Sequence, residues 1–345
     1  MAVCVSPITA DELFEKLKRI SQNHPLCRYS YDRCLRLTPL INEILELKAE
    51  RSALILAHTY VHPDILYGVA DHVGDSYGLA KKARAAEEGT IVFPAVRFMA
   101  ETAKILNPGK TVIDPNPNGG CSLADSIDAK EVYRLRSLYP DHTFVCYINT
   151  TAAVKAACDV CVTSSNVYRI LERLPSRKIY FLPDRLMAEN AKKQLQERGI
   201  DKEIVAYPGT CYVHEEFEPE SVDLFKSLDP DALVFAHPEC KPEVVAKADF
   251  VGSTSQMHRT VLERQNENRP FLLLTECGVA SRLSVEAPKA RLIGGCTVCR
   301  YMRSNSLSDI ARALRNPLPS QIIEIEPSVL DKARLCIERM FEYAE

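Results

Sequence analysis

The sequence lacks the features that mark a membrane protein or a nucleic-acid-binding protein. No apolar run approaches the roughly 18 residues that a membrane-spanning helix needs. Lysine and arginine are scattered, and the formal net charge is −3, so no positive field would attract nucleic acid or an anionic membrane. We therefore expect neither a nucleic acid nor a membrane as a partner.

The N-terminus lacks the basic start and long apolar centre of a secretory signal, and acidic residues appear by Asp11 and Glu12. We expect a cytoplasmic protein, in which thiols stay reduced. The 13 cysteines then indicate free thiols and metal ligands rather than a disulfide framework. The phosphate-binding motifs G-x-G-x-x-G and G-x-x-x-x-G-K-[ST] are absent, so no nucleotide cofactor is implied.

The chain instead contains a repeat of α/β character. From Ala53 onward, short apolar runs of strand length alternate with helical segments, which is typical of parallel α/β proteins. The strand text ALILAHTY at 53–60 recurs as TFVCYINT at 143–150 and LVFAHPEC at 233–240. A period near 90 residues is too long for a solenoid and fits a small α/β domain.

We therefore predict an α/β fold of three homologous three-layer α/β/α units in pseudo-threefold arrangement, with the active site at their common interface. The predicted boundaries are an N-terminal extension at 1–37 and units at 38–125, 126–214 and 215–317, the first completed by the C-terminal residues 318–345. Thr9 with Glu12 forms a capping-box signature in the extension. Thr38-Pro39 predicts a helix start, and QIIEIE at 321–326 predicts a strand.

Each unit delivers one cysteine after its last strand: Cys121, Cys211 and Cys299, which lie 90 and 88 residues apart. Three thiolates select zinc, copper(I) or an iron–sulfur cluster. A structural zinc would want a fourth protein ligand, whereas a cubane with three cysteines leaves one iron open as a Lewis acid. The alternative is that all three are buried core cysteines. The nearby glycines favour a ligand, because they suit close backbone approach: Gly119, Gly120, Gly209, Gly294 and Gly295.

Polar residues recur at two further positions of the repeat. The first strands end in His58 with Tyr60, Tyr147 with Asn149, and His237 with Glu239. Ligands of open α/β sheets bind beyond the carboxyl ends of strands. The next helices start with hydroxyl groups: Ser76, Ser164, and Ser253 with Thr254. Alone each is a plain N-cap, but three equivalent helix starts favour a site for several carboxylates or a phosphate.

Taken together, these segments resemble the quinolinate synthase family, the A protein of de novo NAD biosynthesis. The resemblance covers about residues 38–345 in the family's order and spacing. The motifs that carry it are ILAHTY, GDSYGLA, CSLAD, YINTTAAVKA, TSSN, FLPD, GTCYVHEEF, AHPEC, ADFVGSTS and CRYM.

The resemblance implies an oxygen-sensitive 4Fe–4S cluster on Cys121, Cys211 and Cys299, with one open iron. Iminoaspartate would condense with dihydroxyacetone phosphate to quinolinate, with loss of phosphate and water. The implied catalytic residues are Tyr60, Tyr147, His237 and Glu239, with Tyr60 and Glu239 as the acid–base pair. The implied substrate-binding residues are His58, Ser76, Tyr147, Ile148, Asn149, Ser164, His237, Pro238, Glu239, Ser253 and Thr254. The resemblance also allows a transient contact with the L-aspartate oxidase that supplies iminoaspartate.

Some cysteines and one histidine leave alternatives open. Cys296-x-x-Cys299 makes the third ligand ambiguous; the family pattern of a cysteine followed by an aromatic or polar residue and methionine favours Cys299, and in some members such an extra cysteine is proposed as a regulatory disulfide partner. Cys158-x-x-Cys161 could be redox-active only if it is exposed at a helix start. His214 could support a metal site or be an ordinary structural histidine.

Two other functions compete with a quinolinate synthase. One is an iron–sulfur hydro-lyase of aconitase-like chemistry on a different substrate. The other is a non-enzymatic metal or redox sensor that uses the two C-x-x-C pairs. A cluster protein would be brown when it is purified anaerobically, whereas a zinc sensor would be colourless.

Overall fold

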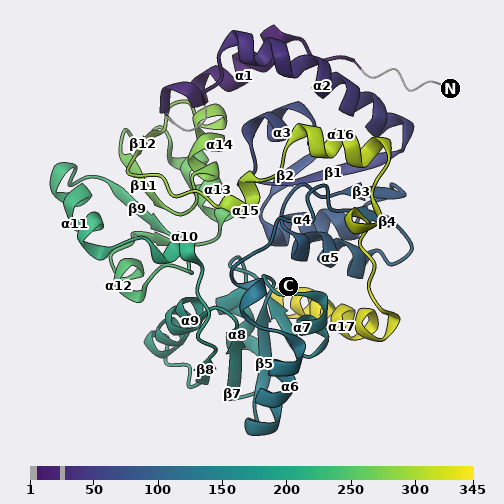
Figure 1. Cartoon of the computed structure of the whole chain (residues 1–345). Coiled ribbons are helices and arrows are strands. Elements are labelled where there is room, and N and C mark those ends of the chain that lie inside the picture. The colour runs from purple at the N-terminus through teal and green to yellow at the C-terminus, as the bar shows by residue number, and fades with distance from the viewer. Residues whose placement is uncertain (1–5, 24–27) are drawn as a thin grey trace. The chain divides into compact units, whose positions relative to one another are not determined.

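The structure, a computed structural model, describes residues 6–23 and 28–345 (Figure 1). Cys4, Cys27 and parts of the predicted extension lie outside the described residues. The chain forms two compact units: residues 1–119, 258–271 and 276–324 make the first, and residues 120–257, 272–275 and 325–345 make the second. Nowhere in the described ranges is a helix both long and apolar enough to cross a membrane.

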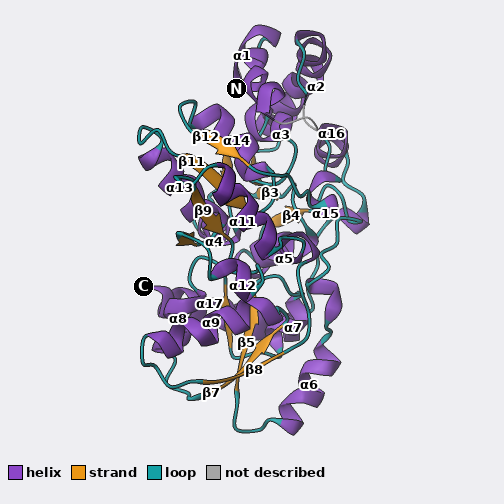
Figure 2. Ribbon diagram, turned by 90° about the vertical axis from the view of Figure 1, so that its left-hand side faces the viewer, coloured by secondary structure: helices purple, strands orange, loops and turns teal. Residues whose placement is uncertain are grey.

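Three four-stranded parallel sheets flanked by helices confirm the predicted α/β class and its threefold repeat (Figure 2). Each sheet places its second strand at one edge, followed by its first, third and fourth. The sheets are β2(His72–Gly74)-β1(Ala53–His58)-β3(Thr90–Val92)-β4(Thr111–Ile113), β6(Val160–Val162)-β5(Thr143–Tyr147)-β7(Lys178–Leu182)-β8(Glu203–Ala206), and β10(Phe250–Val251)-β9(Leu233–Ala236)-β11(Pro270–Leu274)-β12(Arg291–Ile293).

The helices follow the same repeat. Those of the first repeat are α2(Tyr31–Glu50), α3(Pro63–Gly68), α4(Ser76–Arg84) and α5(Arg97–Leu106). Those of the second are α6(Ala129–Leu138), α7(Ala152–Ala156), α8(Val167–Arg173), α9(Arg185–Glu197) and α10(Tyr212–Glu215). Those of the third are α11(Pro219–Leu228), α12(Pro242–Val245), α13(Thr254–Arg264), α14(Gly278–Glu286) and α15(Arg300–Arg303). The central strands β1, β9 and β11 are buried along their whole length, and β5 and β7 are buried beyond their first residue, which explains the continuous apolar runs in the sequence.

An aspartate just before the second strand repeats in all three sheets, although the sequence analysis did not identify it. Its carboxylate accepts a hydrogen bond from an amide of the first strand: Ile55 to Asp71 at 2.8 Å, Phe144 to Asp159 at 2.7 Å and Val234 to Asp249 at 2.8 Å. A cation on the helix before that strand pairs with each: Lys48 with Asp71, Arg136 with Asp159, and Lys226 with Asp249. Equivalent ion pairs therefore fix the start of the first strand in all three repeats.

The N-terminal helix α1(Ala10–Asn23) has the predicted capping box, since the amide of Thr9 donates to Glu12 at 2.8 Å and the amide of Glu12 donates to the Thr9 hydroxyl at 3.2 Å. Its apolar stripe of Leu13, Leu17 and Ile20 is fully buried. The helix packs on α2, α3 and α14. The extension is thus part of the core of the first compact unit.

Two local predictions were wrong. Helix α2 begins at Tyr31 rather than at Thr38, because Ser30 caps it by accepting from the amide of Arg33, and Pro39 lies inside the helix. Residues 321–326 form no strand; Ile322 makes a single antiparallel bridge to Ile113, because the short helix η2(Pro319–Gln321) leads directly into it.

The last helices belong to different compact units. Helix α16(Leu307–Arg315) packs on α2 in the first. Helix α17(Pro327–Ala344) packs on α7, α8 and β6 in the second, beside the second sheet (Figure 1). Its buried face includes Ala333, Cys336, Ile337 and Met340. From the sequence, we assign residues 318–345 to the first α/β unit. Helix α17 instead covers the second sheet. The domain boundaries themselves stay a prediction.

Candidate active site

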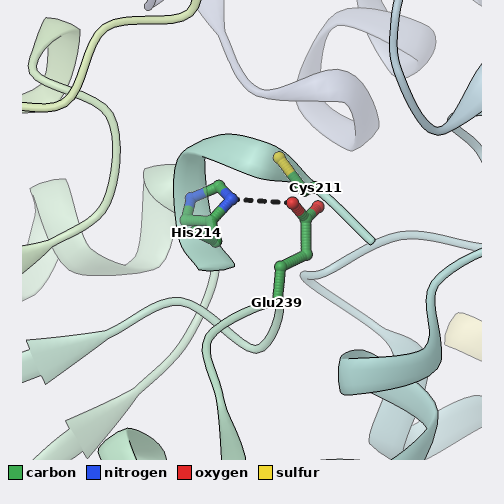
Figure 3. A group of neighbouring side chains, drawn as sticks. All are labelled: Cys211, His214 and Glu239. Carbon is green, nitrogen blue, oxygen red and sulfur yellow. Dashed lines mark hydrogen bonds and ion pairs between the residues drawn. The ribbon is translucent and has the colours of Figure 1, made fainter. Parts of the chain in front are cut away.

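Glu239 is the centre of a buried hydrogen-bond network in the second compact unit (Figure 3). It lies on the turn that follows β9, and both carboxylate oxygens have partners. The Tyr147 hydroxyl donates to Oε1 at 2.5 Å, and Nδ1 of His214 lies 2.7 Å from Oε2. Nε2 of His214 lies 3.0 Å from the Thr275 hydroxyl. Four side chains from three strand ends and one short helix therefore form one chain of hydrogen bonds.

The chain of hydrogen bonds fixes one proton position on His214. An ionised carboxylate can only accept, so Nδ1 of His214 carries the proton and donates it to Glu239. Nε2 of the ring lies against the hydroxyl of Thr275, which can donate to it or accept from it. The ring also stacks on His237, with centroids 4.3 Å apart. His214 is thus held on three sides.

Opposing effects set the pKa of Glu239. Burial raises this pKa, but the charges that His214 and His237 carry when they are protonated, together with the hydrogen bonds from His214 and Tyr147, outweigh burial. The net result holds the pKa of Glu239 below its usual range. The carboxylate is therefore ionised at neutral pH, as a general base requires.

The thiol of Cys211 lies in surroundings that disfavour a free thiolate. Burial raises its pKa well above the usual range, and the negative charges of Glu239 and Cys121 raise it further. A thiolate there needs compensating positive charge, which a bound metal supplies. The interaction with Cys121 also shows that the two predicted ligands of the second compact unit lie near each other.

Three ligand atoms, from Cys211, His214 and Glu239, lie within 4.8 Å of one another and could hold a metal ion (Figure 3). However, two ligands around a tetrahedral zinc ion would be about 3.3 Å apart, and the nitrogen of His214 lies only 2.7 Å from the oxygen of Glu239. The geometry therefore favours a hydrogen-bonded pair beside the thiol. The cysteine-rich chain still fits a metal-based cofactor.

The strand end of the first repeat resembles that of the third. The amide of Tyr60 donates to Nδ1 of His58 at 3.2 Å, and the amide of Glu239 donates to Nδ1 of His237 at 3.4 Å. Because Nδ1 accepts in both cases, the proton of each neutral ring lies on Nε2. Both histidines are buried, and the His58 ring packs edge-on against Tyr60 with centroids 4.4 Å apart.

The predicted helix starts differ in detail. Ser76 is the first residue of α4, but Asp75 is the N-cap, with its carboxylate accepting from the amide of Gly78 at 2.9 Å. Ser253 does cap α13, which begins at Thr254, since its hydroxyl accepts from the amide of Gln256 at 3.3 Å. The capping positions thus agree with the sequence only in part.

The second repeat places its serines before the helix. Ser164 lies three residues ahead of α8, whose N-cap is Asn166. The next residue, Ser165, donates to the Ser253 hydroxyl at 2.8 Å, so the structure brings together the loops of two repeats. Ile148 is buried and donates through its amide to Val162. Within the described part of the chain, Oδ1 of Asn149 is buried without a hydrogen-bond partner.

The three predicted metal ligands occupy equivalent places. Cys121, Cys211 and Cys299 are half-buried thiols outside any disulfide, and each follows the last strand of its repeat. Cys211 and Cys299 are the N-caps of α10 and α15, and Cys121 precedes the short helix η1(Ala124–Ser126). These positions agree with the repeat that was read from the sequence.

Cys296 is not free, because it forms a disulfide with Cys277 at the start of α14. This departs from the expectation of free thiols and metal ligands only; the Cα atoms are 5.3 Å apart, within disulfide reach, which sequence spacing does not reveal. Beside it, the amide of Cys299 donates to Oε1 of Glu276 at 3.3 Å. Of this C-x-x-C pair, only Cys296 takes part in a disulfide.

The other C-x-x-C pair is in the core. Cys158 and Cys161 are buried and interact with Cys146 of β5, whose sulfur lies 3.6 Å from that of Cys336 on α17. A thioredoxin-like role would require an exposed pair at a helix start. All four thiols are buried, as is usual for cysteines that pack as small residues in a protein core.

Sequence reasoning missed Thr275, which supplies the last hydrogen bond to His214. Thr275 directly follows β11, so the rule that polar residues at strand ends mark a site could have found it. The sequence also left the role of His214 open, because a spacing of three from Cys211 does not show which carboxylate faces the ring.

The repeated parallel α/β fold places an ionised glutamate, histidines and a tyrosine at strand ends, beside cysteine thiols. This arrangement is that of an α/β enzyme whose thiols suit a metal-based cofactor. The chain belongs to the quinolinate synthetase A protein family, whose family model matches residues 42–342. It is 44% identical over 330 residues to a protein named quinolinate synthase 2 from Mesorhizobium japonicum, covering 93% of this chain and 99% of that protein.

Other relatives agree. The quinolinate synthase of Agrobacterium fabrum is 42% identical, covering 90% of each chain, and that of Xylella fastidiosa is 39% identical, covering 94% of this chain and 96% of its own. The family that the sequence motifs indicated is therefore confirmed.

Proposed function

We propose that this chain is a quinolinate synthase of NAD biosynthesis that condenses iminoaspartate with dihydroxyacetone phosphate. One phosphate and two waters leave, which balances the atoms of the two substrates against quinolinate. The observation that carries the proposal is the network of Tyr147, Glu239 and His214, which supplies an ionised base with both oxygens oriented. The names of the relatives support the same reaction.

The proposed cofactor is a 4Fe–4S cluster on Cys121, Cys211 and Cys299. The donor set supports it, since one cysteine outside any disulfide stands at the equivalent position of each repeat, while Cys296 is bonded to Cys277. The raised pKa of Cys211 supports it as well, because a thiolate there needs positive charge. When it is bound, such a cluster with one open iron supplies a Lewis acid for a substrate oxygen.

Glu239 would act as the general base of the reaction. The carboxylate is ionised in the buried network, so it can take a proton from a substrate carbon or hydroxyl. His214 and Tyr147 hold the two oxygens in fixed directions, which limits the reorganisation needed at the moment of transfer. When Glu239 gains a proton, the imidazole of His214 stays in place, because Thr275 remains hydrogen-bonded to its other nitrogen.

Tyr60 would be the partner acid. The elimination of phosphate and of two waters needs protons delivered to leaving oxygens, and a tyrosine hydroxyl can both give and regain a proton. His58 and His237 would donate from Nε2 to substrate oxygens, because Nδ1 of each ring already accepts from the backbone.

The remaining predicted residues would bind the anionic ends of the substrates. Hydroxyls and free amides at helix starts suit carboxylate and phosphate groups. The proposed binding residues are His58, Ser76, Tyr147, Ile148, Asn149, Ser164, His237, Pro238, Glu239, Ser253 and Thr254. A transient contact with the L-aspartate oxidase that makes iminoaspartate, and a cytoplasmic location, complete the proposal.

The decisive experiment uses protein that is purified anaerobically and assayed for iron and sulfide. Cluster-loaded protein is mixed with oxaloacetate, ammonia and dihydroxyacetone phosphate, and quinolinate is measured by chromatography. We expect quinolinate to form only when all substrates are present. Absence of quinolinate from cluster-loaded wild-type protein would refute the proposal and favour a hydro-lyase on another substrate.

A further inference from the structure

The turn that carries Glu239 is held by a side chain to which we have assigned no role so far. Nδ2 of Asn190 donates to the carbonyl of Pro238 at 2.9 Å and to the carbonyl of Cys240 at 2.7 Å. These two carbonyls stand on either side of Glu239 in the chain. One amide group therefore ties together the peptides before and after the proposed base.

Asn190 is well placed to hold the turn rigidly. Its side chain is buried, with 3% of the residue exposed, and it extends from α9, a helix of 13 residues. The start of this helix is itself fixed, because the carboxylate of Asp184 accepts from the amide of Met187 at 2.8 Å. Both hydrogens of the Asn190 amide are used on the turn, so its orientation is determined.

The repeat shows that this amide is a special feature of the second repeat. Arg97, Arg185 and Cys277 are equivalent, since the amide of each donates to the loop after the last strand of its repeat, and the residues five positions further on are Thr102, Asn190 and Arg282. Thr102 donates to Phe98 and Arg282 donates to Glu286, each within its own helix. Of these three positions, only the one that faces the Glu239 turn carries an amide with two donors.

The other hydrogen bonds of the turn are longer than the two from Asn190. The amide of Cys240 donates to the carbonyl of His237 at 3.0 Å, and the amide of His237 donates to Leu274 at 3.2 Å. The amide of Glu239 makes a longer bond of 3.4 Å to its neighbour His237. Without Asn190, two buried carbonyls next to Glu239 would lose their donor, and the turn would shift to satisfy them.

We propose that Asn190 is a positioning residue that fixes the direction of the Glu239 carboxylate for proton transfer. This inference rests on the proposed function, in which Glu239 is the base. A shift of the turn moves Oε1 and Oε2 away from Tyr147 and His214. Misplacement of a catalytic group by about 1 Å costs on the order of 100-fold in rate, even when substrate binding is retained.

The chain provides a matched control in Asn107. Its Nδ2 also donates to two backbone carbonyls, those of Ala83 at 2.8 Å and Ala103 at 3.1 Å, and its side chain is likewise buried. This residue joins α4 and α5 in the first compact unit and has no place in the proposed machinery. Loss of its amide should therefore lower stability without affecting the reaction.

The test compares Asn190→Leu with Asn107→Leu in cluster-loaded enzyme. We expect Asn190→Leu to lower kcat by about 10- to 100-fold and to change KM by less than about 3-fold, with unchanged iron and sulfide. Asn107→Leu should lose a comparable amount of thermal stability and keep kcat within about 2-fold. Equal kcat losses in the two variants, or a normal kcat in Asn190→Leu, would overturn the inference.

Two further measurements separate the possible failures. If Asn190→Leu does not fold, Asn190→Ala, which removes the two donors without adding bulk or a buried charge, replaces it with the same criteria. Backbone hydrogen exchange of the segment 237–240 should be faster in the Asn190 variant and unchanged in the Asn107 variant. Unchanged exchange in both variants would show that Asn190 does not hold the turn. If wild-type enzyme makes no quinolinate, the proposed function fails, and the exchange measurement still tests whether Asn190 holds the turn.

Discussion

Nδ1 of His214 lies 2.7 Å from Oε2 of Glu239, and both side chains are almost completely buried. The two residues are 25 positions apart in the sequence, and they meet because a cysteine-capped helix end and a strand-end turn face each other within the second compact unit. This pairing keeps the glutamate ionised in surroundings that would otherwise favour its protonated form. The reactivity that we propose depends on this balance.

Glu239→Gln should remove the base and preserve the fold. Glutamine has nearly the same shape, but it carries no charge and cannot accept a proton from the substrate. We expect kcat to fall by at least about 100-fold, while iron content and circular dichroism stay unchanged. The control is Glu243→Gln, an exposed glutamate four residues further along the chain. A Glu239→Gln enzyme with wild-type kcat would show that the base lies elsewhere.

Tyr60→Phe removes one hydroxyl from the strand end after β1. Since phenylalanine fills the same volume beside His58, the fold and the cluster should be retained. Turnover should stop, because the proposed acid is gone; quinolinate formation measures this. Tyr133→Phe, at a tyrosine that is 52% exposed, should behave like wild type. Normal turnover in Tyr60→Phe would transfer the acid role to another residue, most directly Glu239.

Cys299→Ala should abolish cluster loading, whereas Cys296→Ala should retain it. The reason is that Cys299 is in no disulfide, whereas Cys296 is bonded to Cys277. Iron and sulfide analysis after anaerobic purification gives the result without any assay of turnover. Cluster loss in Cys296→Ala together with cluster retention in Cys299→Ala would reverse the ligand assignment.

Asp114 should make stability depend on pH. Burial raises its pKa to about 6, and the hydrogen bond from Asn116 and the charge of Arg97 oppose this only in part. Between its ordinary pKa of 3.8 and about 6, the folded state holds a proton that the unfolded state has lost, so stability falls as pH rises through this window. Asp114→Asn removes the penalty and should gain about 1–3 kcal/mol at neutral pH.

Thermal unfolding between about pH 3.5 and about pH 7.5 checks this expectation, because this range spans the whole window from 3.8 to about 6. The gain of Asp114→Asn should vanish at the acidic end. Asp331→Asn, at an exposed position of α17, should follow the wild-type curve throughout. Parallel curves for Asp114→Asn and wild type would mean that Asp114 carries no such penalty.

The repeat could be predicted from the sequence because it is written in local patterns. Buried parallel strands need continuous apolar runs, and the strand ends and helix starts follow them at fixed spacing, so Cys121, Cys211 and Cys299 could be aligned without a structure. The start of α2 could not be predicted, because Pro39 is a common first helical residue and the cap at Ser30 competes with it.

The sequence by itself therefore determined the family, the threefold α/β repeat and the strand ends that carry the proposed site. Only the tertiary structure decided which side chains meet: Thr275 with His214, Asn190 with the Glu239 turn, Cys277 with Cys296, and α17 with the second sheet. The physical reason is that hydrogen bonds and disulfides act over a few ångströms. Which residues come within that distance depends on how whole elements pack, and spacing along the chain does not encode it.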